Sequence, residues 1–211
     1  MNYAKLEAEL LAEIDWRVKE LTTLRTLPLK RNLNMRERKI AVKFAIPNAY
    51  STWEGFVKTA FRLYINELNS LNLSHVQLNH KILSHSIDTK YPQLTTGVKN
   101  DFASKCSFID NFINDLTNPI TIDSKLPTES NINWKVINKL LERFNLTKFP
   151  ENPYKSKLND LLRIRNSVAH GDVTIPIDQE LIDNKVTDVI NLMDEVLFKL
   201  LNGCSDNTYR K

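Results

Sequence analysis

The stretch AYSTWEGFVKTAFRLYINEL, residues 49–68, carries its apolar side chains at the spacing of an α-helix. One apolar face is formed by Tyr50, Trp53, Val57, Phe61, Tyr64 and Leu68. Apolar residues that recur every three to four positions are typical of a helix that buries one side. The same pattern extends from about Met35 to Leu71. Pro47 is expected to kink or divide this helix, because proline removes one backbone hydrogen bond and clashes with the preceding turn.

The segments on both sides of this stretch follow the same pattern. Residues 3–28 repeat Leu6, Leu10, Ile14, Leu21 and Leu24 and stop at Pro28. Further helices are predicted at about 100–117, at 134–144 with Asn133 as N-cap, at about 155–169, and from Gln179 to about Leu201. Residues 72–99 and 118–133 are less regular, with one short helix and an extended piece at Ile120–Ile122. The sequence therefore predicts an all-α protein, an up-and-down helical bundle that forms a single domain over residues 1–211 with an irregular insertion or connection at about 72–133.

The composition is that of an ordinary globular protein. With 42% hydrophobic and 26% charged residues, the chain can bury a core, so extensive disorder is not expected. The formal charge of +4 is compatible with a polyanionic partner but does not require one. Cys106 and Cys204 have no C-x-x-C spacing and are interpreted as reduced thiols. No leader and no apolar run of about 20 residues is found, so a cytoplasmic location without membrane contact is expected.

The stretch LLRIRNSVAHGD, residues 161–172, places an arginine in an apolar stripe. On a helix at 155–169, Arg165 falls near the middle of a sector formed by Leu158, Leu161, Leu162, Val168 and Ala169. A guanidinium against apolar surface needs an anion, because loss of its hydration is costly. That anion can come from this fold, from a second subunit or from a ligand. A purely structural alternative is a buried ion pair with another acidic side chain or with Glu54, which lies at the margin of the 49–68 apolar face.

His170 and Asn166 complete a group that suits phosphodiester chemistry. Gly171 favours the left-handed turn that ends a helix, so His170 is expected at the helix end, with Asn166 one turn before it on the same side. A histidine can act as general acid or base near neutral pH. Arginine offers a planar fork to phosphate oxygens. Attack of an RNA 2′-hydroxyl on the neighbouring phosphorus needs these groups and no metal or cofactor. His170 can instead simply interact favourably with the helix dipole.

One chain supplies one such histidine, whereas this reaction uses a base and an acid. A two-fold dimer brings two copies together and completes the site. It also accounts for an arginine on an apolar face, since that face can be part of the interface. A homodimer is therefore expected.

The motif RNSVAH, Arg165 to His170, resembles the R-x4-6-H signature of the HEPN superfamily (higher eukaryotes and prokaryotes nucleotide-binding), with a polar residue directly after the arginine. DWRVKEL in the first helix and AYSTWEGFVK in the second are similar to a prokaryotic branch of that superfamily. The resemblance touches both ends of the chain, but residues 72–133 align to nothing.

The resemblance implies an all-α bundle, a dimer with facing motifs, and a metal-independent endoribonuclease with Arg165, His170 and Asn166 as catalytic residues. Members often act as toxins or defence effectors, so an antitoxin or defence-system protein is a possible partner. In some toxin members the motif continues to H-x-Y, and a partner enzyme modifies the tyrosine. Asp172 stands at that place here, which puts such regulation in doubt.

Other residues receive more limited interpretations. Arg17 lies in the stripe of the first helix and is expected to pair with Glu54 in a supporting role. The basic run Lys30, Arg31, Arg36, Arg38 and Lys39 is a solvated surface or an RNA-binding track. His75, His80 and His85 do not match metal-ligand spacing and are expected at the surface or in loops.

Two other functions remain open from the residues alone. The first is a catalytically inactive module that binds RNA, a nucleotide or a protein partner. The second is a structural dimerisation subunit in which Arg165 forms an interface ion pair.

Overall fold

The computed structural model describes residues 1–90, 102–128, 131–171 and 175–211. These residues form seven α-helices, one short 3-10 helix and no β-strand. The elements are α1 (Tyr3–Thr26), η1 (Leu27–Leu29), α2 (Met35–Ser70), α3 (His80–Lys90), α5 (Phe102–Asp115), α6 (Trp134–Arg143), α7 (Tyr154–Ala169) and α8 (Gln179–Ser205). The predicted all-α helical bundle is confirmed. No helix in the described ranges is both long and apolar enough to cross a membrane.

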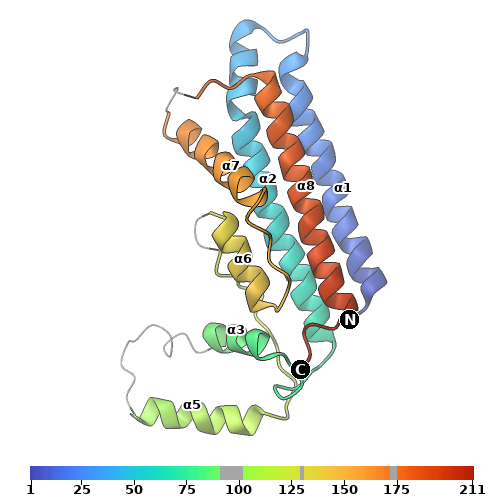
Figure 1. Cartoon of the computed structure of the whole chain (residues 1–211), viewed down its shortest axis with the longest axis vertical. Coiled ribbons are helices and arrows are strands. Elements are labelled where there is room, and N and C mark those ends of the chain that lie inside the picture. The colour runs from blue at the N-terminus through green and yellow to red at the C-terminus, as the bar shows by residue number, and fades with distance from the viewer. Residues whose placement is uncertain (91–101, 129–130, 172–174) are drawn as a thin grey trace.

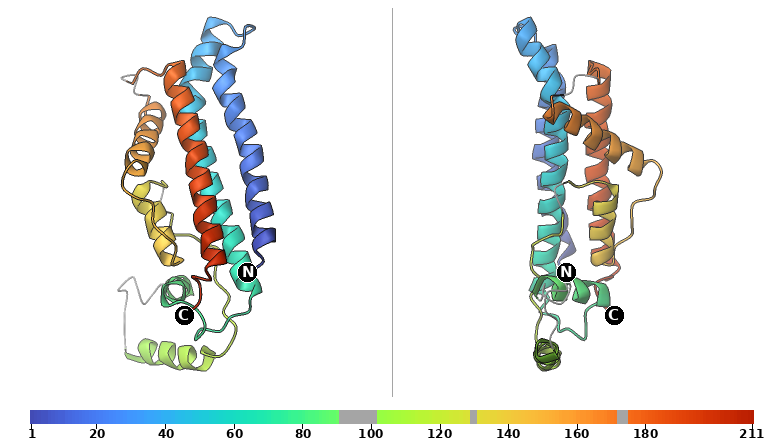
Figure 2. Two further views of the ribbon diagram at one scale, coloured as in Figure 1. Left: turned by 45° about the vertical axis from the view of Figure 1, so that its right-hand side comes forward. Right: turned by 90° about the vertical axis from the view of Figure 1, so that its left-hand side faces the viewer.

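Three long helices, α1, α2 and α8, run side by side and form the body of the bundle (Figures 1 and 2). The predicted stripe of α1 is buried at Leu6, Leu10, Ile14 and Leu21. Helices α6 and α7 lie along one side of α2. Helices α3 and α5 lie at the end of the bundle where both termini are found (Figure 1). Helices α3, α5, α6 and α7 therefore cover one end and one side of the three-helix body.

Helix α2 continues through Pro47 and is not divided there. Its start is fixed by a capping box, in which the Asn34 side chain accepts a hydrogen bond from the Glu37 amide and the Glu37 carboxylate accepts one from the Asn34 amide. Such a cap satisfies amides that the first helical turn leaves without partners. Pro47 removes only one further hydrogen bond, and burial of the long apolar face beyond it outweighs that loss.

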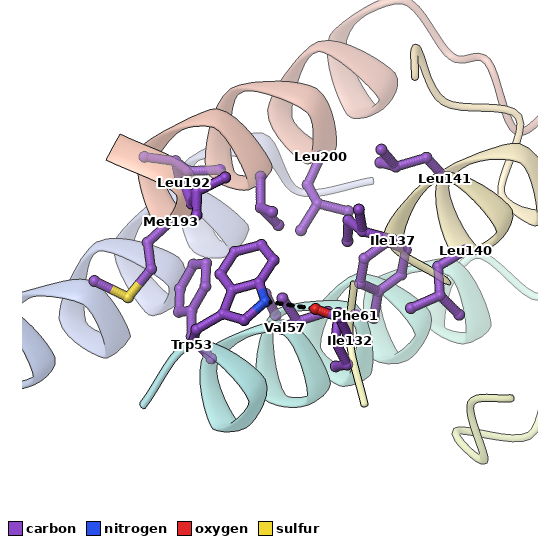
Figure 3. Packing of buried hydrophobic residues seen from close by; sticks show 14 of the residues in the cluster. Trp53, Val57, Phe61, Ile132, Ile137, Leu140, Leu141, Leu192, Met193 and Leu200 are labelled. Carbon is purple, nitrogen blue, oxygen red and sulfur yellow. Dashed lines mark hydrogen bonds between the residues drawn. The ribbon is translucent and has the colours of Figure 1, made fainter. Parts of the chain in front are cut away.

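Trp53 lies at the centre of the core (Figure 3). Its indole is fully buried between α8, which contributes Leu192 and Met193, and α6, which contributes Ile137. Its Nε1 donates to the Ile132 carbonyl at 3.0 Å. Trp53 therefore joins the two long helices to the segment that leads into α6.

The middle of the chain follows the prediction in its helices and differs in the piece before α6. Asn133 is the N-cap of α6, as expected, and its side chain accepts a hydrogen bond from the Val136 amide at 3.0 Å. The extended piece at Ile120–Ile122 is not a strand. Both isoleucines are buried, and the Ile120 amide donates to the Leu73 carbonyl, but the pairing stops at an isolated bridge between Ser74 and Pro119.

The expectation that His75 and His85 are solvated is wrong. Both are buried, whereas His80 is exposed. The His85 ring lies 4.9 Å from the Phe144 ring, and its Nδ1 lies 3.3 Å from Nη1 of Arg143, which also donates to Asp88 at 2.9 Å. Helix α3 packs on α6, so His85 contacts residues almost 60 positions away that periodicity cannot reveal.

His85 is expected to make the fold sensitive to acid. Burial and the nearby Arg143 lower the pKa of His85 from 6.5 to about 4, and the carboxylate of Asp88 only partly opposes this. As pH falls below about 6.5, His85 becomes protonated in the unfolded chain but stays neutral in the folded chain until the pH approaches 4. Stability is therefore lost between about pH 6.5 and pH 4, by up to about 3 kcal/mol. Urea unfolding at several pH values measures the slope.

A matched pair of variants isolates this effect. His85→Gln is expected to flatten the slope of stability between pH 6.5 and pH 4. His80→Gln, at an exposed position on the same helix, is expected to leave it unchanged. Equal slopes for wild type and His85→Gln would contradict the assignment.

Candidate active site at the end of helix α7

Helix α7 positions the motif residues. It packs against α2 through the buried side chains of Leu158, Leu161, Ile164 and Val168. Arg165 is half-buried at the edge of this face, Leu162 is half-buried and Ala169 is exposed. The buried face of α7 is therefore centred closer to Ile164 than predicted. Arg165 lies at the edge of this face and not in its middle.

Arg165 is held by an aromatic ring and an amide. Its guanidinium carbon lies 5.7 Å from the centre of the Tyr50 ring, on α2. Its Nη1 donates to the side-chain oxygen of Asn166 at 2.9 Å. An arginine over a ring face is attracted by the ring's quadrupole, and the amide fixes the orientation of the planar fork. Within the part of the chain that the structure describes, no carboxylate forms an ion pair with Arg165.

Tyr50 connects Arg165 to Glu54. The Tyr50 phenol donates a hydrogen bond to Oε1 of Glu54 at 3.3 Å. Oε1 of Glu54 also accepts a hydrogen bond from the Ile132 amide at 3.1 Å. Burial raises the pKa of Tyr50 well above its ordinary value, and the Glu54 carboxylate adds to this. The phenol therefore remains a hydrogen-bond donor. Tyr50 thus links Glu54 to Arg165, and Glu54 also anchors the backbone before α6.

The predicted pairing of Arg17 with Glu54 is wrong. Arg17 is buried and forms its ion pair with Glu13, one turn earlier on α1, while its Nη1 also donates to the Glu13 carbonyl at 2.8 Å. Its guanidinium lies over the Trp16 ring at 4.1 Å and reaches α2 beside Gly55, where a Cβ would lie 3.8 Å from Nη2. Glu54 instead accepts hydrogen bonds from the Tyr50 phenol and the Ile132 amide.

The Glu13 carboxyl group can form an ion pair with Arg17 because the carboxyl group is ionised. Partial burial opposes ionisation, but the hydrogen bonds from Arg17 and Trp16 outweigh it, so the pKa of Glu13 is lowered. Arg17 therefore links α1 to α2 at Gly55. Among the described residues it makes no hydrogen bond or ion pair with Arg165.

His170 is exposed at the end of α7. It is the C-cap residue, and its backbone amide donates to the Asn166 carbonyl at 3.0 Å. Gly171 has a φ of 75°, so the predicted left-handed turn is confirmed. Neither Arg165 nor Asn166 hydrogen-bonds to the His170 ring within the described residues. The structure therefore joins Arg165 directly to Asn166 and leaves the imidazole free to reach a ligand. Asp172 lies outside the described residues.

The basic run is only partly assembled near this site. Arg31, Arg36, Arg38 and Lys39 are all exposed. Arg38 and Lys39 line a groove of about 500 Å³ between the start of α2 and the end of α7, together with Lys43, which the sequence interpretation missed. Lys43 follows Lys39 by one helical turn, a spacing that could have indicated it. Arg31 and Arg36 do not line the groove.

No metal site is evident in the ranges that the structure covers, where no three His, Cys, Asp or Glu side chains gather in one place. The polar groups of the site are cations, an amide, a phenol, an imidazole and the Glu54 carboxylate, which accepts hydrogen bonds from Tyr50 and Ile132. Such a set suits an anionic ligand rather than a bound cation.

Comparison with known families places the chain. The family model described as MAE_28990-like HEPN matches residues 6–209, nearly the whole length. The protein belongs to the HEPN family. No curated protein and no solved structure matches it significantly. In this HEPN protein the match includes Arg17, Glu54 and the Arg165–His170 motif, so the resemblance seen in three short stretches extends through the irregular middle.

Proposed function

We propose that this HEPN protein is a metal-independent endoribonuclease that acts as a homodimer, in the role of a toxin or defence effector. The observation that carries the proposal is the local arrangement on α7. Arg165 is oriented by Tyr50 and Asn166, and the exposed His170 follows at the end of the same helix. An oriented arginine beside an accessible imidazole is suited to phosphodiester cleavage.

In the proposed reaction the 2′-oxygen of one ribose attacks the adjacent phosphorus. His170 of one subunit accepts the 2′-hydroxyl proton, and His170 of the partner subunit gives a proton to the departing 5′-oxygen. The bond from the 2′-oxygen to phosphorus forms and the bond to the 5′-oxygen breaks. Arg165 binds the non-bridging oxygens and stabilises the charge that gathers on them. The products are a 2′,3′-cyclic phosphate and a 5′-hydroxyl.

Exposed apolar side chains support a dimer. Ile40 and Phe44, one turn apart on α2, are 50% and 46% exposed. Large exposed apolar side chains on an otherwise polar helix face are typical of an interaction surface. A two-fold axis beside this face would join two copies of the chain.

Mixing wild-type and His170→Ala protein tests the shared site. Where both histidines of a dimer are required, only dimers of two wild-type subunits cleave. An equal mixture, after subunit exchange, should then retain about a quarter of the activity of the same total amount of wild-type protein. Independent subunits would retain about half. The measurement is cleavage of a fluorophore-quencher RNA in EDTA, and activity proportional to the wild-type fraction would contradict a composite site.

A second candidate is a binding module without catalysis. It is favoured by one observation, that no side chain in the described residues orients the His170 ring. In that case the protein binds RNA without cutting it, and binding survives His170→Ala. Gel-shift and cleavage assays on the same RNA distinguish the two functions.

A further inference from the structure

The groove beside α7 has a composition that the site itself does not explain. Its lining combines apolar side chains with three cationic side chains. The apolar lining residues are Met35, Val42, Val168, Ile175 and Ile177, and the cations are Arg38, Lys39 and Lys43. A volume of about 500 Å³ lies in the range of small-molecule sites, which are mostly apolar with a few placed polar groups. The groove therefore suits a ligand with one flat apolar part and more than one negative charge.

The groove adjoins the motif. Val168, in its wall, follows Arg165 by three residues and precedes His170 by two. It therefore lies within one helical turn of each. We therefore expect a ligand whose phosphate contacts Arg165 and His170 to be able to reach this groove. Its second wall comes from the start of α2 and from the segment before α8.

The cations match a nucleic-acid backbone. Lys39 and Lys43 are one turn apart on α2, about 6 Å along the helix axis, which is close to the separation of neighbouring phosphates in a nucleic-acid strand. Lys43 is exposed, and its ammonium lies 5.6 Å from the centre of the Phe44 ring. Both lysines can follow a backbone while the base lies on the apolar lining residues.

We propose that this groove binds an unpaired nucleobase of RNA next to the scissile phosphate, with Lys39 and Lys43 on the flanking phosphates. This inference rests on the proposed function and specifies its substrate class as single-stranded RNA. A base in a duplex cannot enter such a groove without leaving its stack and its pair. The lining residues that the structure describes include no amide or carboxylate side chain to read a base edge, so we expect the groove to accept different bases.

The test measures binding rather than cleavage, so it does not depend on catalysis. Fluorescence anisotropy follows a 2′-O-methyl RNA of ten nucleotides, which has no 2′-hydroxyl to react. It is compared with its duplex and with forms in which one base at a time is replaced by an abasic sugar. Wild type is expected to bind the single strand about tenfold more tightly than the duplex, and one abasic position should weaken binding several-fold.

Three variants localise the effect. Lys39→Gln with Lys43→Gln is expected to weaken binding about tenfold and to reduce its salt dependence. Lys58→Gln with Arg62→Gln is the matched control, since it removes the same charge at the same spacing on α2, about 22 Å from Lys43. It should have the smaller effect. Val42→Gln adds a polar side chain to the groove and should abolish the difference between the intact and abasic strands.

The inference would be overturned by duplex binding as tight as single-strand binding, by no abasic effect in wild type, or by equal losses for the Lys39/Lys43 and Lys58/Arg62 double variants. Loss of dimerisation rather than RNA binding in Val42→Gln, seen by sedimentation, would assign the groove to a second copy of the chain. Cleavage that disappears in His170→Ala while these binding results fail would leave the proposed function intact and remove only the groove.

Discussion

His170→Ala is expected to reduce RNA cleavage by about a thousandfold or more, while the protein still folds. The imidazole is the proposed proton carrier, and the substitution removes it from both halves of a dimer. Single-site loss of a general acid or base costs about 100- to 10,000-fold. The side chain is exposed, so its removal should change the free energy of unfolding by no more than about 0.5 kcal/mol.

The matched control is His80→Ala, a second exposed histidine far from α7 in the fold. Its cleavage rate should equal that of wild type under single-turnover conditions. Circular dichroism and thermal melts of both variants should overlay on wild type. A His170→Ala enzyme that keeps most of its activity would remove the proton-transfer role.

Trp53→Ala is expected to produce the largest loss of stability, about 3–5 kcal/mol. The indole is fully buried between α2, α6 and α8, so its removal leaves a large cavity. The variant also leaves the buried Ile132 carbonyl without its hydrogen-bond donor. Because a domain of this kind has a total stability of about 5–15 kcal/mol, the variant should be close to unfolding at 37 °C.

Trp16→Ala is the control for a tryptophan that is not in the core. Its side chain is 47% exposed, so its loss should cost about 1 kcal/mol, mainly through the contact with Arg17. Urea unfolding of both variants gives the comparison. Similar losses for the two tryptophans would contradict the position of Trp53 at the centre of the core.

The helices could be predicted because their signals are local. Apolar spacing defines α1, α2 and α8, and the Asn133 cap of α6 and the Gly171 turn after α7 depend on neighbours within a few residues. Pro47 left two outcomes open, since whether a proline divides a helix depends on how much surface the following turns bury. His85 was misjudged for the same reason: its burial comes from α6, far along the chain.

In the candidate site, too, contacts between distant parts of the chain could not be predicted from the sequence. The sequence interpretation assigns Asn166 to the substrate or to the His170 ring, and it does not predict the hydrogen bond that Arg165 donates to Asn166. The expected pairing of Glu54 with Arg17 failed because Glu13 lies closer on the same helix and because Glu54 accepts hydrogen bonds from Tyr50 and Ile132. Lys43 and Val168 meet across a groove although about 125 residues separate them, and a single sequence contains no signal for that meeting.

The chemical identity of the cleavage products tests the central claim most directly. Purified protein is incubated in EDTA with an end-labelled single-stranded RNA, and the new ends are determined by mass spectrometry. The proposed mechanism predicts a 2′,3′-cyclic phosphate and a 5′-hydroxyl from wild type and no product from His170→Ala. Products with a 3′-hydroxyl and a 5′-phosphate, or the same cyclic ends from His170→Ala, would contradict it.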